Sequence, residues 1–144
     1  RCDCAAVALD EYRIVVAGGR SPAADALKST EILDVRTMSF APGPSMGLAR
    51  CFCAAVRVDA QHVLILGGQD SAKTLLATAE LLDVATMEFA PGPAMQAGRA
   101  GIAAVRLGAA GEDARILVLG GTLSSTELLA VDAERGARAT RHRH

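Results

Sequence analysis

Short runs of aliphatic residues alternate along the whole chain with clusters of Gly, Pro, Asp and Ser. The runs are about four to six residues long, for example residues 14–17 and 63–66. Runs of this length and composition, bounded by turn-forming residues, predict β-strands. Only residues 23–29 and 73–79 have a composition compatible with a helix, and both are too short for the connecting helices of a βαβ array. The pattern therefore predicts an all-β protein.

The same pattern occurs three times. Residues 4–7 read Cys-Ala-Ala-Val, residues 53–56 repeat this 49 positions later, and residues 102–105 read Ile-Ala-Ala-Val after another 49 positions. A Gly-Gly pair ends the second aliphatic run of each unit, at residues 18–19, 67–68 and 120–121. One arginine keeps the same register in each unit, namely Arg1, Arg50 and Arg99. A repeat of this length is typical of arrays of similar supersecondary units.

Each unit reads as four short strands. In the first unit we expect them at residues 5–9, 13–17, 30–35 and 38–41. Asp34 and Asp83 begin the turn into the fourth strand, where an aspartate side chain can bond its own backbone. The third unit has no counterpart of the Phe-Ala-Pro-Gly-Pro motif that ends the first two, so we expect its last strand to be incomplete or irregular. The predicted units cover about residues 1–49, 50–98 and 99–133 of a single domain (1–144), with a basic irregular tail at 134–144.

Residues 63–66 and 116–119 are continuously apolar. An antiparallel strand with one solvated face should alternate, so these strands need cover on both faces. Sheets stacked as blades around a central axis provide that cover, and such propellers close with about four to eight blades. Three blades would leave one open face at each end. The chain also begins at Arg1, in the middle of the pattern. We therefore expect missing blades from the same longer chain or, less favoured, a homo-oligomer.

The period near 50, the Gly-Gly pair, the Thr/Ala-Glu pair, the aspartate turn, the aromatic residue and the late Arg together resemble the kelch repeat. The resemblance covers essentially the whole chain and weakens after Ala130. Leu33 and Leu82 stand where kelch repeats usually carry Tyr, and Phe40 and Phe89 stand where they usually carry Trp. The Trp-Asp pair and the shorter period of the other large propeller family are absent. The resemblance implies a partial β-propeller of about three four-stranded antiparallel kelch-type blades.

The net charge of the chain and the short length of its apolar runs argue against two classes of partner, nucleic acids and membranes. The net charge is −1, which gives no general attraction to nucleic acid or to an acidic membrane surface. A membrane-spanning helix would need about 18 apolar residues in a row. We therefore expect neither nucleic acid nor a membrane as partner. The Gly-Gly pairs also lack the following helix and Lys-Ser/Thr of a phosphate-binding loop.

Three glutamates recur in register, one in each unit: Glu31, Glu80 and Glu127. Equivalent positions on separate blades do not assemble into an acid–base or metal site. A buried carboxylate needs hydrogen bonds or an opposite charge. We therefore interpret the glutamates as internal ties to backbone amides or to the repeated arginines Arg50 and Arg99.

The remaining candidates for chemistry are the four cysteines and the histidines. The cysteines form two Cys-x-Cys pairs, Cys2/Cys4 and Cys51/Cys53, and the third unit replaces them with Ala100 and Ile102. This replacement favours a packing role over a zinc site or a disulfide. Reduced cysteines favour an intracellular, cytoplasmic location. His62 has no assignable nucleophile, and His142 and His144 lie in the basic end. We predict no catalytic residue, no cofactor and no metal.

Strand direction places the longer loops on one end of the propeller, because antiparallel strands alternate in direction. This loop face carries residues 20–28, 69–74 and 122–125 and the segments leading to the repeated arginines. Rigid scaffolds present binding residues on such loops. The predicted contact residues are Arg20, Ser21, Lys28, Arg50, Gln69, Asp70, Lys73 and Arg99.

The kelch resemblance implies a protein-interaction module that recognises a protein or peptide, as a substrate-recognition or scaffold domain. The alternative is a fragment of a kelch-like enzyme, either galactose-oxidase-like or sugar-epimerase-like. A copper enzyme of the first kind needs a Tyr/His/Cys set, which this chain, with one Tyr and three His, cannot supply alone. A purely structural part of a propeller is a third possibility. We predict that the chain is not an enzyme.

Overall fold

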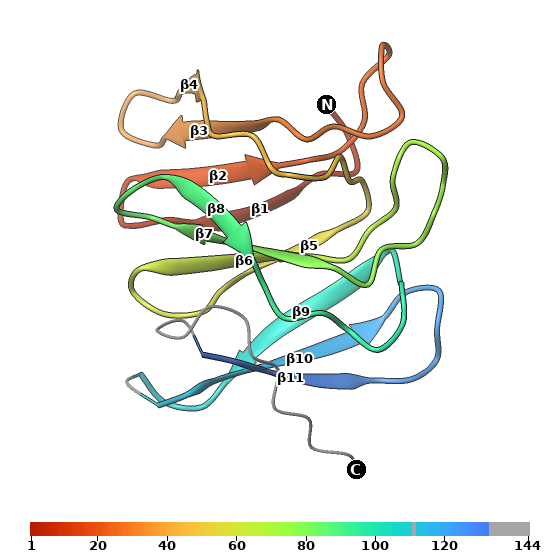
Figure 1. Ribbon diagram of the computed structural model, residues 1–144. Helices are drawn as coiled ribbons and strands as arrows, with labels where there is room; N and C mark the ends of the chain where they lie inside the picture. The colour runs from red at the N-terminus through yellow and green to blue at the C-terminus, as the bar shows by residue number, and fades with distance from the viewer. Residues whose placement is uncertain (111, 133–144) are drawn as a thin grey trace.

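The structure is a computed structural model that describes residues 1–110 and 112–132. Within these residues it contains eleven strands and no helix, which confirms the all-β prediction. The strands form three antiparallel sheets (Figure 1). The first sheet has the strands β1 (Ala5–Ala8), β2 (Arg13–Ala17), β3 (Thr30–Asp34) and β4 (Ser39–Pro42). The second has β5 (Ala54–Arg57), β6 (His62–Leu66), β7 (Ala79–Asp83) and β8 (Glu88–Pro91). The third has β9 (Ile102–Leu107), β10 (Ala114–Gly120) and β11 (Glu127–Val131).

The sequence repeat reappears as a repeat of strand register. Ala5 pairs with Ala17, and their equivalents Ala54 and Leu66 pair in the second sheet. The third and fourth strands also pair in the same register in both sheets, with Glu31 opposite Pro42 and Glu80 opposite Pro91. Each sheet is a simple meander in which consecutive strands are neighbours. A fourth strand of the third unit and the basic tail would fall on residues outside those that the structure describes.

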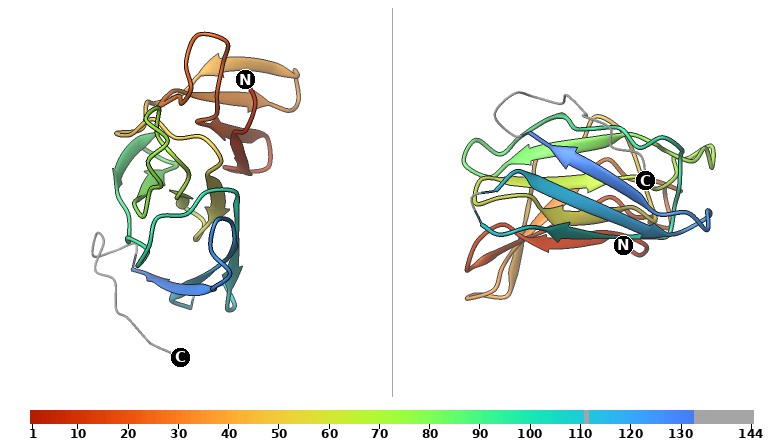
Figure 2. Two further views of the ribbon diagram at one scale, coloured as in Figure 1. Left: turned by 90° about the vertical axis from the view of Figure 1, so that its right-hand side faces the viewer. Right: turned by 90° about the horizontal axis from the view of Figure 1, so that it is seen from below.

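The three sheets fan out around one side of the molecule (Figure 2). Strand β1 contacts β5, and β5 contacts β9, so the first strands of successive sheets form the inner edge of the fan. The last strands, β4 and β8, lie at the outer edge (Figure 2). This is the arrangement expected for consecutive propeller blades.

Two apolar layers hold the sheets together. Between the first and second sheets, Val15 and Ala17 pack with Val63 and Ile65. Between the second and third sheets lie aliphatic side chains of both, namely Leu64, Leu66, Ile116 and Val118. All four residues of the run 63–66 are fully buried, so β6 is covered on both faces as its sequence requires. Within the described part of the chain, each of the two end sheets packs against another sheet on one face only.

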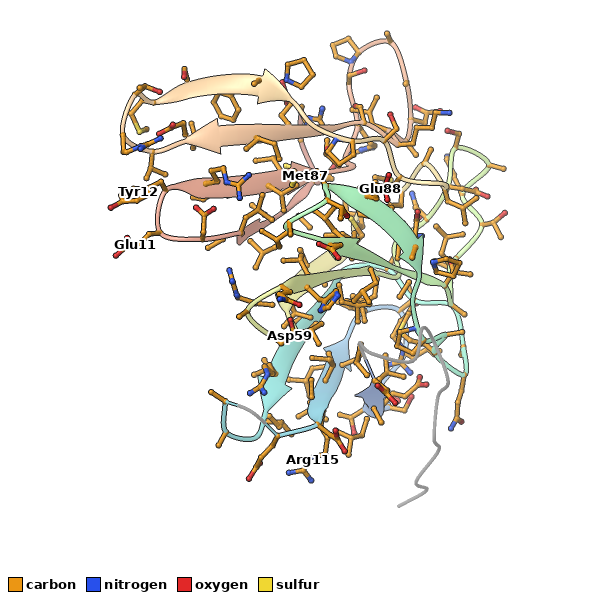
Figure 3. The ribbon with its side chains drawn as sticks, turned by 60° about the vertical axis from the view of Figure 1, so that its left-hand side comes forward. Glu11, Tyr12, Asp59, Met87, Glu88 and Arg115 are labelled. Atoms are coloured by element: carbon orange, nitrogen blue, oxygen red, sulfur yellow. The ribbon has the colours of Figure 1, made fainter. Side chains whose placement is uncertain are left out.

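The turns at one end of the sheets depend on aspartates. Asp34 Oδ1 accepts a hydrogen bond from the backbone N–H of Arg36 at 2.9 Å, and Asp83 Oδ1 accepts one from Ala85 at 2.8 Å. The Arg36 side chain also donates to Asp34, and this hydrogen bond, together with the backbone one, lowers the pKa of Asp34 to about 2. Glu11, Tyr12 and Asp59 lie at this same end (Figure 3). The longer connections lie at the opposite end, which is the loop face.

A Gly-Gly pair ends β2 and β6 because the chain turns there with positive φ. Gly67 has φ +66°, and a Cβ at this position would lie 2.8 Å from the carbonyl oxygen of Arg99. Glycine adopts this left-handed conformation without steric cost. The pair therefore lets each sheet approach the segment that starts the next unit. Within the residues described above, no helix is long and apolar enough to cross a membrane.

Candidate partner-binding face

The loop between β6 and β7 is held in shape by hydrogen bonds to one of its own side chains. Asp70 Oδ1 accepts hydrogen bonds from the backbone N–H groups of Ala72 and Thr74, both at 2.9 Å. Lys73 follows with φ +63° and an exposed side chain at the tip. Gln69, at the base of the loop, pairs with Cys51 and is half-buried. The predicted contact residues of this loop thus divide into Asp70, which shapes the turn, and Lys73, which faces solvent.

The loop between β2 and β3 reaches toward the second sheet. Arg20 Nε donates to Asp3 Oδ2 at 2.7 Å, and the Arg20 guanidinium lies over the Phe52 ring, 4.9 Å from its centroid. The hydrogen bond to Asp3 raises the pKa of Arg20. Ser21 accepts from the backbone N–H of Ala23 and shapes its own turn. Arg20 is therefore held in place on both sides while part of its side chain remains exposed.

An open hollow of about 350 Å³ lies beside Arg20 on the loop face. It is lined by Arg1, Cys2, Arg20, Ser21, Pro22 and Asp25. Lys28, farther along the same loop, is exposed. The hollow combines cationic, anionic and hydroxyl groups, which suits a polar or charged group of a partner.

A ladder of backbone hydrogen bonds crosses the inner edge of this face. The N–H of Phe52 donates to the carbonyl of Asp3 at 2.9 Å, and the N–H of Gly101 donates to the carbonyl of Phe52 at 2.8 Å. The three residues share one position of the repeat, and all have positive φ. This ladder fixes Phe52 beneath Arg20. Phe52 was not among the residues predicted from the sequence, although its position between two cysteines of the repeat could have indicated it.

Arg50 and Arg99 require a correction. From the sequence we expected both among the contact residues of the loop face, but Arg50 is 0% exposed and Arg99 is 2% exposed. Arg50 donates to the carbonyl oxygens of Gly67 and Thr78, at 2.8 and 3.0 Å. Arg99 donates to the carbonyl of Ser125 at 2.6 Å. Buried side chains engaged in this way do not present a surface, so both residues are structural.

The repeated glutamates join consecutive units. Glu80 accepts hydrogen bonds from the backbone N–H groups of Gly47 at 2.5 Å and Leu48 at 3.3 Å, and it pairs with Arg50 at 3.0 Å. Glu127 accepts a hydrogen bond from the N–H of Gln96 at 2.6 Å in the same way. We call this combination of arginine, glutamate and loop amide the latch. The internal tie expected from the sequence is therefore present, and it crosses from one unit to the next.

The latch, the Gly-Gly turns and the four-stranded meander occupy the positions that the repeat predicted. In a comparison with family models, residues 1–47 match the model described as Kelch motif. Residues 1–47 therefore form a kelch motif. The matched kelch unit contains the whole first sheet, the second sheet repeats its strand pairing, and the third repeats its first three strands. A comparison with curated proteins gives no match.

A second hollow lies between the first and second kelch units, at their outer edge. It is an open groove of about 760 Å³, and Arg50 and Glu80 of the latch form part of its lining. Its apolar lining includes Pro44, Met46, Leu48, Met87, Phe89 and Pro91. Met87 and Glu88, at the turn into β8, are labelled in Figure 3. This groove could not be predicted from the sequence, because its walls come from two units.

The cysteines of the two kelch units differ in burial despite their shared position. Cys2 and Cys4 are exposed, whereas Cys51 and Cys53 are buried, and all four are free thiols. Burial raises the pKa of Cys53 to about 11. In the part of the chain that the structure describes, no three His, Cys, Asp or Glu side chains are grouped as a metal site. His62 Nδ1 lies 3.0 Å from the carboxylate of Asp59, which accounts for it as a polar residue at a strand end. His142 and His144 lie outside the described residues.

Proposed function

We propose that this kelch-repeat chain is a protein-interaction module whose loop face recognises a protein or peptide partner. The observation that carries the proposal is Arg20, which is fixed between Asp3 and the Phe52 ring beside an open hollow. Arginine and aromatic residues dominate the binding energy of protein interfaces. A side chain that is held in place before binding loses little conformational entropy on binding.

The proposed contact surface contains the exposed or half-buried members of the predicted set. These are Arg20, Ser21, Lys28, Gln69, Asp70 and Lys73. Phe52 joins them as the platform for Arg20. The tyrosine that an oxidase-type copper site would require, Tyr12, lies at the opposite end of the sheets under Arg36, 4.7 Å from ring centroid to guanidinium. No described contact favours the enzyme alternative over recognition.

Arg36 gives a matched control for Arg20. Both arginines pair with an aspartate and stack on an aromatic ring, but they lie at opposite ends of the sheets. Peptides would be selected from a displayed random library against the wild-type chain, and their Kd values measured with Arg20→Ala and Arg36→Ala. We expect Arg20→Ala to weaken binding by about 30-fold or more, as for a binding hot spot of about 2 kcal/mol. We expect Arg36→Ala to leave the Kd unchanged.

The two variants should also unfold at nearly the same temperature, because both remove an exposed ion pair. Failure to select any peptide, or an equal effect of the two variants on Kd, would contradict recognition through the loop face.

A further inference from the structure

Among residues 1–110 and 112–132, no strand covers the outward faces of the first and third sheets, and both faces are apolar. On the first sheet, one row of paired residues runs from Ile14 through Leu33 to Phe40, which is 59% exposed. We call this the leading face. On the third sheet, a row runs from Val105, 47% exposed, through Leu117 to Leu128. We call this the trailing face.

Each of these faces is one half of an interface that the chain already builds. The equivalent of Phe40 in the second sheet is Phe89, which packs against the core between the first and second sheets. The equivalent of Val105 is Val56, which is buried between the second and third sheets. A trailing face thus meets a leading face at both internal boundaries. The open trailing face of the third sheet is therefore of the type that packs against a leading face, such as the open one of the first sheet.

Cysteine burial shows the same asymmetry. Cys53, on the leading side of the second sheet, is 8% exposed beneath the first sheet. Cys4, at the same position of the first sheet, is exposed. Only a covering sheet distinguishes the two positions.

Polar groups at the two ends are complementary as well. In the backbone ladder each N–H donates to the carbonyl of the preceding unit. Among residues 1–110 and 112–132, the N–H of Asp3 and the carbonyl of Gly101 take no part in such a bond, and they stand at opposite ends of the ladder.

We propose that two copies of this chain associate head to tail, with the trailing face of each copy covering the leading face of the other. The partner is a second copy because one chain carries both faces in complementary senses. Gly101 of one copy would accept a hydrogen bond from Asp3 of the other and continue the ladder. Two copies of three sheets give a ring whose size falls within the range of about four to eight blades at which propellers close. A head-to-tail contact that closes in this way leaves no open end.

The test uses one variant on each face. Phe40→Asp alters the leading face and Val105→Asp the trailing face, and both residues are exposed enough to tolerate the change within the monomer. Ala85→Asp, at an exposed turn residue of the second sheet, is the control. Light scattering coupled to size-exclusion chromatography would give the mass of each. We expect a two-chain mass for the wild type and for Ala85→Asp, and a lower mass for each face variant alone.

Mixing the two face variants distinguishes this contact from any other. The intact trailing face of Phe40→Asp still fits the intact leading face of Val105→Asp, so an equimolar mixture should recover a two-chain species through one contact. If Phe40→Asp does not fold by circular dichroism, Val16→Asp on the same face replaces it. A monomeric wild type, a larger assembly, or face variants that stay dimeric alone would overturn the proposal. A mixture that stays monomeric would do so as well.

Discussion

Replacing Glu80 with alanine removes the centre of a latch. Its carboxylate accepts hydrogen bonds from two backbone N–H groups, of Gly47 and Leu48, and from the guanidinium of Arg50. Arg50 is 0% exposed, so Glu80→Ala leaves a buried positive charge without its counter-charge and two amides without an acceptor. Breaking a buried ion pair by removing one partner costs about 3–5 kcal/mol. We expect a loss of free energy of unfolding of that size.

Glu31 provides the control at the same position of the repeat. Its side chain is 42% exposed and contacts Arg1 at 3.0 Å. Exposed ion pairs contribute about 0–1 kcal/mol, so Glu31→Ala should cost little in a monomeric chain. The two substitutions delete the same atoms from the same strand position, and their costs should differ by about 3 kcal/mol.

Urea unfolding followed by circular dichroism measures both variants. With a denaturant slope of about 1–3 kcal/mol per M, a difference of about 3 kcal/mol moves the midpoint by about 1–3 M. If Glu80→Ala does not fold, Glu80→Gln keeps one acceptor oxygen and should give an intermediate loss. Equal losses for the Glu80 and Glu31 variants would refute the view that the latch owes its strength to burial and to the amides of the preceding unit.

Three further outcomes follow from the structure. Cys53, buried and with a pKa of about 11, should react with iodoacetamide at pH 8 only after urea is added, and mass spectrometry showing rapid labelling in the native state would contradict its burial. NMR titration should give Asp34 a pKa of about 2, and Arg36→Ala should raise this pKa toward 3.8. Because the pKa of Asp34 is lower in the folded state, its ionised carboxylate stabilises the fold at pH values above 3.8. This contribution to the free energy of unfolding is lost as the pH falls toward 2. In the monomeric Phe40→Asp background, Gly67→Ala should lower the urea midpoint more than Gly120→Ala, because both glycines have positive φ but a Cβ has free space only at Gly120 of a single chain. Similar midpoints would argue against the close approach of the next unit.

The sequence predicted the strands well because their ends are chemically marked. Strand β2 has the predicted limits, residues 13–17, since an aspartate turn precedes it and a Gly-Gly pair follows it. Strand β4 spans Ser39–Pro42, one residue later than predicted, because Met38 takes a positive φ and belongs to the turn. Periodicity and turn residues thus carry the local structure.

The candidate site was less predictable because it depends on how the units meet. Arg50 follows a loop in sequence, which suggested exposure, but its side chain enters the sheet that follows. Cys4 and Cys53 occupy the same position, yet one is exposed and the other buried, since a neighbouring sheet covers only the second. The groove at Met46 and Phe89 likewise requires two units to be placed side by side. A single-chain pattern records the units but not the contacts between them.

The latch also bears on how such a chain changes over evolutionary time. Glu80 and Glu127 each accept a hydrogen bond from a loop amide of the preceding unit, so the joint between units has the same form at both boundaries. An in-frame duplication of residues 50–98 would bring its own Arg50 and Glu80. The duplicated unit would then contact the same kind of loop in the units before and after it. Deletion of a whole unit would likewise rejoin matching ends. The number of units can therefore vary by gene duplication without the invention of a new kind of contact.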